Sequence, residues 1–251
     1  MPDLSSSLAL KVSRRLARYV PTRPRMLRPQ RAVVSFTFDD VPDTAYTNGA
    51  RLLDDYGLRG TFYIAPGICG KTEDHWRVLT REQTADLSRR GHEIGCHTYA
   101  HAAVQSLSVA ELEQDDRNCR ETLLQICGDI PLGNFAFPFG NAGLLRKRQL
   151  QRQYDSCRGI HVGTNRGIID LAMLRVQELY ESTGKAGVDR LLDDVQRKGG
   201  WLIFYTHDVA ENPSAIGCTP ALLDYALKAV TTRGITCMTV ARALTELKLT
   251  P

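Results

Sequence analysis

Four apolar segments of this 251-residue chain end in side chains that can bind a metal ion or move a proton. They read FTFDD, GCHTYAH, FAFPFG and IFYTHD, and they are widely separated in the sequence. Short runs rich in β-branched and aromatic residues are typical of buried strands. If the strands are parallel, their C-terminal ends open on one face and the polar groups meet there. The sequence therefore predicts a chemical site at the mouth of a parallel sheet or barrel.

His97 and His101 are four positions apart in GCHTYAH. One helical turn or a tight loop would place both imidazoles on one side, where they can chelate a single cation. Alone, this spacing is weak evidence, because two unrelated histidines would produce it about as often. A carboxylate from the FTFDD strand would complete a set of two histidines and one aspartate with open positions, which is typical of a hydrolytic metal site. We therefore expect one divalent metal ion; zinc is favoured, and manganese, cobalt, nickel or iron would also fit.

Asp39 and Asp40 stand side by side at the end of the first apolar strand. Adjacent like charges repel, and burying either is costly unless something compensates it. Neighbouring strand residues point to different sides, so one carboxylate can bind the cation while the other accepts a proton from a water. Strand alternation alone does not say which is which. The alternative interpretation is a solvated turn before Pro42.

Two further residues could contribute to such a site. His207, at the end of IFYTHD, could donate a proton to a leaving group, or it could be a core histidine bonded to the backbone. Trp76 lies in a predicted loop near the rim, where an indole could stack on a sugar ring. Packing is an equally good explanation for Trp76.

Short apolar runs alternate with helix-patterned segments along most of the chain. Strands are predicted at about 32–38, 60–65, 92–97, 134–138, 157–162, 173–179, 201–206 and 235–239. Helices are predicted at 80–90 and 108–127, each opened by a capping box, and around residues 188–195 and 222–230. This alternation predicts a distorted (β/α) barrel of seven or eight parallel strands. A doubly wound open sheet is the alternative, but no strand is followed by GxGxxG.

The N-terminal segment, residues 1–30, is predicted to be a basic arm ahead of a single domain at 31–251. Residues 1–31 hold eight of the 32 basic residues but one of the 28 acidic residues. Within them Leu8, Val12, Leu16 and Tyr19 or Val20 fall on one helical face. The arm could rest on an anionic membrane surface, pack on the body or be mobile. No motif supports nucleic-acid binding.

Cysteine usage and the N-terminus bear on location. The seven cysteines form no CxxC pair, and the N-terminus has no apolar core of a signal peptide. No apolar run approaches the roughly 18 residues of a membrane span. We therefore expect a cytoplasmic protein with reduced thiols, which could contact the inner membrane face through residues 1–30.

The ordered set FTFDD, HTYAH, FPFG and YTHD, with RGTFYIA and GHEIGCHT, resembles the NodB-homology polysaccharide deacetylases, the fourth carbohydrate esterase family. The similarity covers about residues 30–245. It implies a distorted (β/α) barrel that removes acetyl groups from N-acetylated sugars with one divalent metal. By position, the resemblance implies Asp39 as the base and Asp40, His97 and His101 as the metal ligands.

The same resemblance implies three more site residues. His207 would be the acid that protonates the departing amine. The backbone N–H of Phe139 would bind the oxyanion, in the place of a tyrosine of the family motif, and Pro138 beside it is expected to contribute to substrate binding.

The chain departs from the family pattern in three places. Ala136 occupies the position of an arginine that orients the catalytic carboxylate, and Arg175 is a candidate replacement. The family's acidic partner of the catalytic histidine has no clear equivalent, with Asp170 as a guess. Finally, TFDDGP has become TFDDVP, which places Val41 in the loop that approaches the substrate.

These features predict a metal-dependent hydrolase that removes an N-acetyl group from an amino sugar. Without a secretion signal, we expect the substrate to be a nucleotide-linked or lipid-linked intermediate of bacterial surface polysaccharide or lipopolysaccharide biosynthesis. One alternative is removal of a formyl group from a lipid-linked aminosugar. Another is a catalytically weak, carbohydrate-binding pseudoenzyme, which Ala136 and the missing partner of His207 favour. The joint presence of all the ligands and proton-transfer groups argues against it.

Overall fold

The computed structural model describes residues 4–28, 31–73 and 75–249. Its strands are β1 (Pro24–Leu27), β2 (Ala32–Asp39), β3 (Thr61–Ile64), β4 (Glu93–Cys96), β5 (Asn134–Ala136), β6 (Ser156–Val162), β7 (Gly167–Asp170), β8 (Leu174–Glu178), β9 (Gly200–Thr206) and β10 (Thr236–Cys237). Its α-helices are α1 (Leu4–Tyr19), α2 (Arg51–Asp55), α3 (Arg81–Arg89), α4 (Val109–Cys127), α5 (Leu144–Leu150), α6 (Gly184–Lys198), α7 (Pro220–Thr232) and α8 (Val240–Glu246). The ends of the predicted arm, at 1–3 and 29–30, and the side chain of Leu8 lie outside the described residues.

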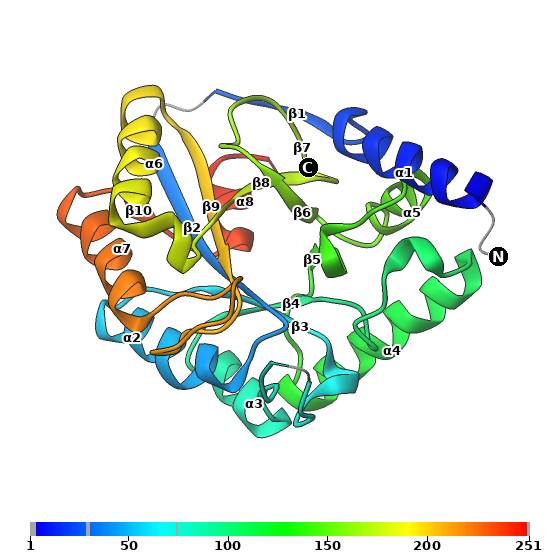
Figure 1. Cartoon of the computed structure of the whole chain (residues 1–251), viewed down its shortest axis with the longest axis horizontal. Coiled ribbons are helices and arrows are strands. Elements are labelled where there is room, and N and C mark those ends of the chain that lie inside the picture. The colour runs from blue at the N-terminus through cyan, green and yellow to red at the C-terminus, as the bar shows by residue number, and fades with distance from the viewer. Residues whose placement is uncertain (1–3, 29–30, 74, 250–251) are drawn as a thin grey trace.

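Seven parallel strands of the described chain close into a barrel in the order β2-β3-β4-β5-β6-β8-β9, and β9 pairs back with β2. Helices surround the barrel (Figure 1). The short β10 pairs with the start of β2, whereas β3 pairs with its end. The predicted (β/α) barrel is therefore confirmed, and the open sheet is excluded.

All eight predicted strands are present, and β1 and β7 are additional. These two pair antiparallel, with Pro24 opposite Asp170 and Leu27 opposite Gly167. In β1 only Leu27 is buried, so the segment lacks the alternating pattern that identifies a half-buried strand. The end of the predicted arm is thus paired with the body of the protein.

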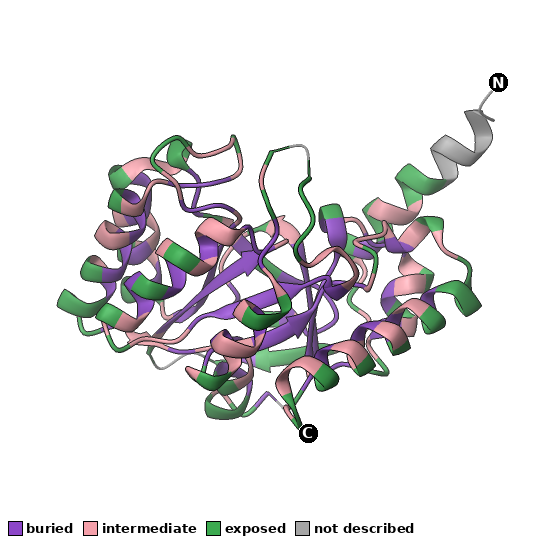
Figure 2. Ribbon diagram, turned by 90° about the horizontal axis from the view of Figure 1, so that it is seen from below, coloured by how far each residue is buried: buried purple, intermediate pink, exposed green. Residues whose placement is uncertain are grey.

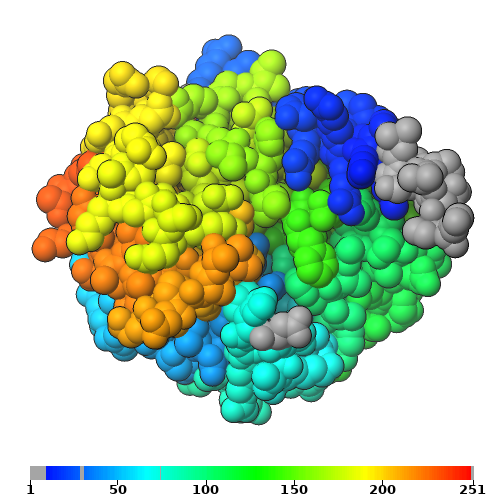
Figure 3. Space-filling view, in the orientation of Figure 1, coloured from blue at the N-terminus to red at the C-terminus, as the bar shows by residue number. Residues whose placement is uncertain are grey.

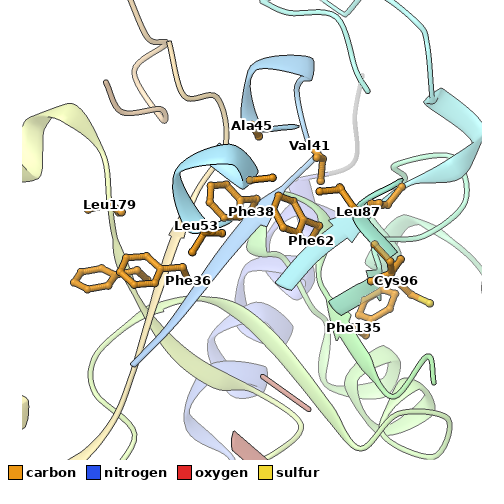
Figure 4. Packing of buried hydrophobic residues seen from close by; sticks show 14 of the residues in the cluster. Phe36, Phe38, Val41, Ala45, Leu53, Phe62, Leu87, Cys96, Phe135 and Leu179 are labelled. Carbon is orange, nitrogen blue, oxygen red and sulfur yellow. The ribbon is translucent and has the colours of Figure 1, made fainter. Parts of the chain in front are cut away.

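The alternation of side chains along β2 decides which of them face the site. Phe36 and Phe38 pack outward in the main hydrophobic cluster, where the rings of Phe38 and Phe62 stack with centroids 4.7 Å apart (Figure 4). Thr37, between them, points the other way and donates a hydrogen bond to a β9 carbonyl. Asp39 continues this second series at the C-terminal end of the strand. Figure 2 shows the buried strands enclosed by helices with exposed outer faces.

The helix predicted in the arm is α1, and it packs against α5. Ala17 is fully buried, whereas Val12 and Leu16 of the predicted apolar face are exposed. The buried Lys147 of α5 donates from Nζ to the carbonyl oxygens of Ala17 and Val20, at 2.7 and 2.8 Å. A cation at a helix C-terminus interacts favourably with the helix dipole. No helix in the described ranges is long and apolar enough to cross a bilayer.

His92, before β4, gives the fold a predicted pH dependence. Its Nδ1 accepts a hydrogen bond from the Gly60 N–H, and burial lowers its pKa to about 4. Because the unfolded histidine titrates near 6.5, the native state loses stability as the pH falls from about 6.5 to 4, by up to about 1.4 kcal/mol per pH unit. In His92→Asn the amide oxygen can still accept from Gly60 but cannot be protonated. Urea unfolding should therefore show a smaller loss of stability for His92→Asn across this window; equal losses in both proteins would contradict the assignment.

Candidate active site

The three predicted metal ligands converge at the mouth of the barrel. Asp40, His97 and His101 offer ligand atoms that all lie within 4.8 Å of one another. Asp40 Oδ1 is 3.1 Å from His97 Nε2 and 2.9 Å from His101 Nε2. This oxygen is buried and has no hydrogen-bond partner among the described residues. A buried carboxylate oxygen facing two ring nitrogens is compensated by a cation, so the donor set fits a divalent metal.

The protonation states suit metal binding. His97 Nδ1 is 2.8 Å from the Ala136 carbonyl oxygen, which can only accept, so Nδ1 carries the proton and Nε2 keeps its lone pair. Burial alone would raise the pKa of Asp40, but His101 and His97 outweigh it and hold the pKa well below its usual range. The carboxylate is therefore ionised, the form in which it ligates a metal.

Asp39 lies beside these ligands and is held by a residue that the sequence analysis missed. The guanidinium of Arg158, on β6, contacts the Asp39 carboxylate directly, and both side chains are buried. The guanidinium lies 4.6 Å from the ring centroid of Tyr63 and 5.4 Å from that of Tyr205. Burial lowers the pKa of Arg158 to about 10, so it remains charged at neutral pH. The ion pair and the cation–π contacts together offset the cost of burying the charge.

The arginine that contacts Asp39 is therefore Arg158 and not the candidate Arg175. Arg175 is exposed and lines a different cleft, outside the barrel. Ala136 and Arg158 are register partners on neighbouring strands, so their side chains point to the same face of the sheet. The guanidinium reaches Asp39 from one strand further along the barrel.

Asp170 likewise does not have the position expected for an acidic partner of His207. It pairs with Lys147 at 2.5 Å and accepts from the backbone N–H of Arg23 at 2.9 Å. Among the described residues, the hydrogen-bonding partner of the His207 ring is the Ile216 carbonyl oxygen, 3.1 Å from Nδ1. Burial lowers the pKa of His207 to about 4, with Asp40 opposing the shift. His207 is thus neutral at neutral pH, with its Nε2 free to accept a proton.

Backbone strain is concentrated around the mouth. Among the described non-glycine residues, those with positive φ next to the site are Asp40 (57°), Val41 (46°), Thr98 (59°), His101 (53°) and Phe139 (58°). Each such conformation costs about 1–3 kcal/mol and persists only where the surrounding structure imposes it. The candidate metal ligands are therefore held in place by the fold before any ligand binds.

Val41 provides a test of this strain, because a β-branched residue with positive φ is a genuine outlier. Its side chain is fully buried, so both Val41→Gly and Val41→Ala lose packing. Only glycine also relieves the backbone. We expect Val41→Gly to be more stable than Val41→Ala by about 1 kcal/mol in urea unfolding. The usual order, with alanine the more stable, would show that position 41 is not strained.

A pocket of about 420 Å³ opens beside these groups. Its walls include Asp39 and the aromatic rings of Trp76, Tyr180 and Tyr205. The Trp76 ring lies within 27° of parallel to the His207 ring, with centroids 5.9 Å apart. In Figure 3 the cyan, green and orange segments near residues 70, 140 and 210 meet around this hollow.

The FPFG motif contributes unevenly to the pocket. The exposed Phe139 ring lies 4.7 Å from the His101 ring and forms part of the wall. Pro138 is buried and does not line the pocket, so the substrate contact predicted for it is not supported by its position.

Comparison with known proteins identifies the family. The family model described as polysaccharide deacetylase matches residues 27–155, slightly more than half of the chain. The chain belongs to the polysaccharide deacetylase family. This family member is 30% identical over 97 residues to a chitin deacetylase of Pestalotiopsis sp, a match that covers 39% of this chain and 31% of that protein. It spans about a third to a half of the length of the curated chitin deacetylases that it matches.

Solved structures of the same fold include enzymes and a pseudoenzyme. A family 4 acetyl xylan esterase from Clostridium thermocellum in complex with a cobalt ion has a TM-score of 0.61 and 22% identity, with 87% of this chain and 93% of that chain covered. A mutant of a family 4 pseudoenzyme has a TM-score of 0.56 and 15% identity, with 86% and 68% covered. At these identities the likeness establishes the fold alone.

Proposed function

We propose that this protein hydrolyses the N-acetyl group of an amino sugar with one divalent metal ion. The observation that carries the proposal is that two neighbouring carboxylates with different contacts lie at one pocket. Asp40 faces His97 and His101 through an oxygen that has no hydrogen-bond partner in the part of the chain that the structure describes. Asp39, next to it, is held by Arg158 and lines the same pocket. A set of metal ligands beside an oriented carboxylate is typical of metal-dependent hydrolases.

In this proposal each side chain has one task. Asp40, His97 and His101 hold the metal, of which zinc is our first choice. When bound, a divalent cation polarises a carbonyl group and lowers the pKa of a water. Asp39 accepts the proton of the attacking water. This is consistent with the position of Asp39, which lines the pocket and whose carboxylate is contacted by the buried Arg158.

The remaining groups stabilise charge and complete the proton transfer. The Phe139 N–H donates to the oxyanion that develops on the amide carbonyl. His207 gives a proton to the departing amine. Since His207 is neutral in the free protein, it can give a proton only after it has taken one up. The proton that Asp39 removes from the water is passed to His207 and from there to the amine, which returns Asp39 to its carboxylate form. Trp76 packs along His207 at the rim and is suited to contact a sugar ring.

We further propose that the substrate is a nucleotide-linked or lipid-linked N-acetylated sugar of bacterial surface polysaccharide or lipopolysaccharide biosynthesis, and that the protein acts in the cytoplasm. The test is release of acetate from a panel that contains chitin oligosaccharides, a nucleotide-linked N-acetylhexosamine and a lipid-linked one. Turnover of a linked sugar above that of the oligosaccharides supports the assignment. Preference for the oligosaccharides contradicts the biosynthetic substrate but not the reaction.

A second candidate reaction is removal of a formyl group from a lipid-linked aminosugar. The same pocket and proton-transfer groups would serve it, because the amide chemistry is unchanged. The panel should therefore include N-formylated counterparts, with formate and acetate measured separately. The pseudoenzyme alternative loses one of its supports, since Arg158 replaces the arginine missing at Ala136. Stoichiometric metal without turnover on the whole panel would favour it again.

The membrane contact proposed for the arm rests on the face that α1 leaves uncovered. Val12, Leu16 and Tyr19 are 50%, 43% and 63% exposed, and Lys11 and Arg15 flank them. An apolar stripe with basic neighbours suits an anionic bilayer surface. Removing the arm would uncover Lys147, so exchange of Val12 and Leu16 for serine is the better test. Sedimentation with phosphatidylglycerol vesicles should decrease in this variant, and unchanged sedimentation would reject the contact.

A further inference from the structure

A second cleft, of about 240 Å³, lies between the C-terminal end of α1 and strands β6, β7 and β8. Its charged and aromatic walls come from Arg18, Tyr19, His161, Arg166, Asp170 and Arg175. Side chains alternate along β6, so Ile160 lines the mouth pocket whereas His161 lines this cleft on the opposite face. The cleft is therefore separate from the candidate active site.

The carboxylate in the wall of the cleft does not neutralise its arginines. Asp170 forms an ion pair with the buried Lys147 and accepts from the backbone N–H groups of Thr22, Arg23 and Ala172, at 3.2, 2.9 and 3.1 Å. These four contacts take up the acceptor capacity of the carboxylate. Its charge is balanced by Lys147.

The arginines of the cleft retain donors for a ligand. Arg18 and Arg175 form no ion pair with any residue in the described ranges. Arg166 pairs with Asp194 through one terminal nitrogen, while its Nε is buried without a hydrogen-bond partner. The pKa of His161 is lowered by burial and by Arg175 and Arg18, as expected if both guanidinium groups lie near one imidazole.

We propose that this cleft binds a phosphate group. Several guanidinium groups around one small space complement a phosphate oxyanion, which they bind through paired N–H donors. The volume is below the roughly 300–1,000 Å³ of pockets that enclose a whole drug-sized ligand, so the cleft suits one charged group of a larger molecule. The phosphate can belong to a lipid headgroup or to a soluble phosphate ester. The rim is compatible with both sources. Tyr19 and Ile168, which are 63% and 70% exposed, would contact lipid, whereas the polar cleft itself would also accept a soluble phosphate ester.

The test uses the full chain and does not depend on any hydrolytic activity. Binding of inorganic pyrophosphate is measured by calorimetry, and sedimentation is measured with vesicles of phosphatidylglycerol and of phosphatidylcholine. In Arg18→Gln/Arg175→Gln we expect the affinity for pyrophosphate to fall at least about tenfold. The matched control is Arg148→Gln/Arg152→Gln, which removes the same charge from exposed positions outside the cleft, on α5 and just after it.

Loss of affinity in the cleft variant alone supports the proposal. Phosphatidylglycerol vesicles that bind and are displaced by pyrophosphate identify a lipid headgroup as the source, whereas pyrophosphate binding without competition identifies a soluble phosphate. Equal losses in both double variants would show diffuse attraction to a basic surface and would overturn the proposal. So would the absence of both pyrophosphate and vesicle binding to the unaltered protein.

Discussion

Asparagine in place of Asp39 is expected to lower kcat/KM for acetate release by about 10²–10⁴-fold while metal affinity stays unchanged. The amide cannot take a proton from water at neutral pH, but its oxygen can still accept from Arg158. The pocket and the ligands are otherwise retained, with a hydrogen bond to the buried Arg158 in place of the ion pair. The measurement pairs steady-state kinetics with a metal titration of each protein.

Substitution of the neighbouring Asp40 should instead lower the affinity for metal. Asp40→Asn removes the charged ligand whose oxygen faces His97 and His101, so metal affinity is expected to fall by at least about a hundredfold. Asp43→Asn, which changes a carboxylate outside the pocket, is the matched control and should alter neither quantity. If Asp39→Asn lost the metal and Asp40→Asn kept it, the two roles would have to be exchanged.

Truncation of Arg158 is the second change with a large expected effect. Arg158→Ala leaves the Asp39 carboxylate buried at 4% exposure without its cation, which should cost about 3–5 kcal/mol of stability in urea unfolding. Deacetylation should fall with it, because the carboxylate is no longer oriented. Arg158→Lys should recover part of the stability but little activity, since an ammonium lacks the planar fork of donors.

Moving the arginine to a neighbouring strand distinguishes its role in orienting the Asp39 carboxylate from its role in stabilising the fold. In Ala136→Arg/Arg158→Ala the guanidinium moves to the register partner on β5, the position where the resembling family carries it. We expect this double variant to recover at least about a tenth of the unaltered kcat, with Arg158→Ala well below it. A double variant that regains stability but no activity would show that Arg158 only compensates a buried charge.

The sequence was sufficient for the barrel and for the residues at its mouth. Buried parallel strands carry continuous apolar runs, so their ends and the polar groups at those ends could be read directly. The prediction missed β1 and β7, in each of which only one residue is buried. Pairing of the N-terminal segment with the body is a tertiary effect without a local pattern.

The spacing of residues in the sequence could not identify Arg158 as the partner of Asp39. Arg158 stands alone in the apolar run SCRGIHV, and a single arginine in a buried strand was a usable signal. Its selection over Arg175 required the β5–β6 register, which pairs Ala136 with Arg158 and depends on the closed barrel. The positive φ of Val41 and the neutral state of His207 likewise follow from burial and backbone geometry, which the sequence does not state.

The most direct test of the central claim is acetate release by protein that has been stripped of metal with a chelator and then titrated with zinc. The preferred substrate of the panel is used, and bound metal is counted in the same samples. We predict no turnover in the stripped protein and full recovery at one equivalent of zinc, with no recovery in His101→Ala. Undiminished turnover in the metal-free protein, or one bound equivalent of metal with no turnover on any substrate, would contradict the proposed function.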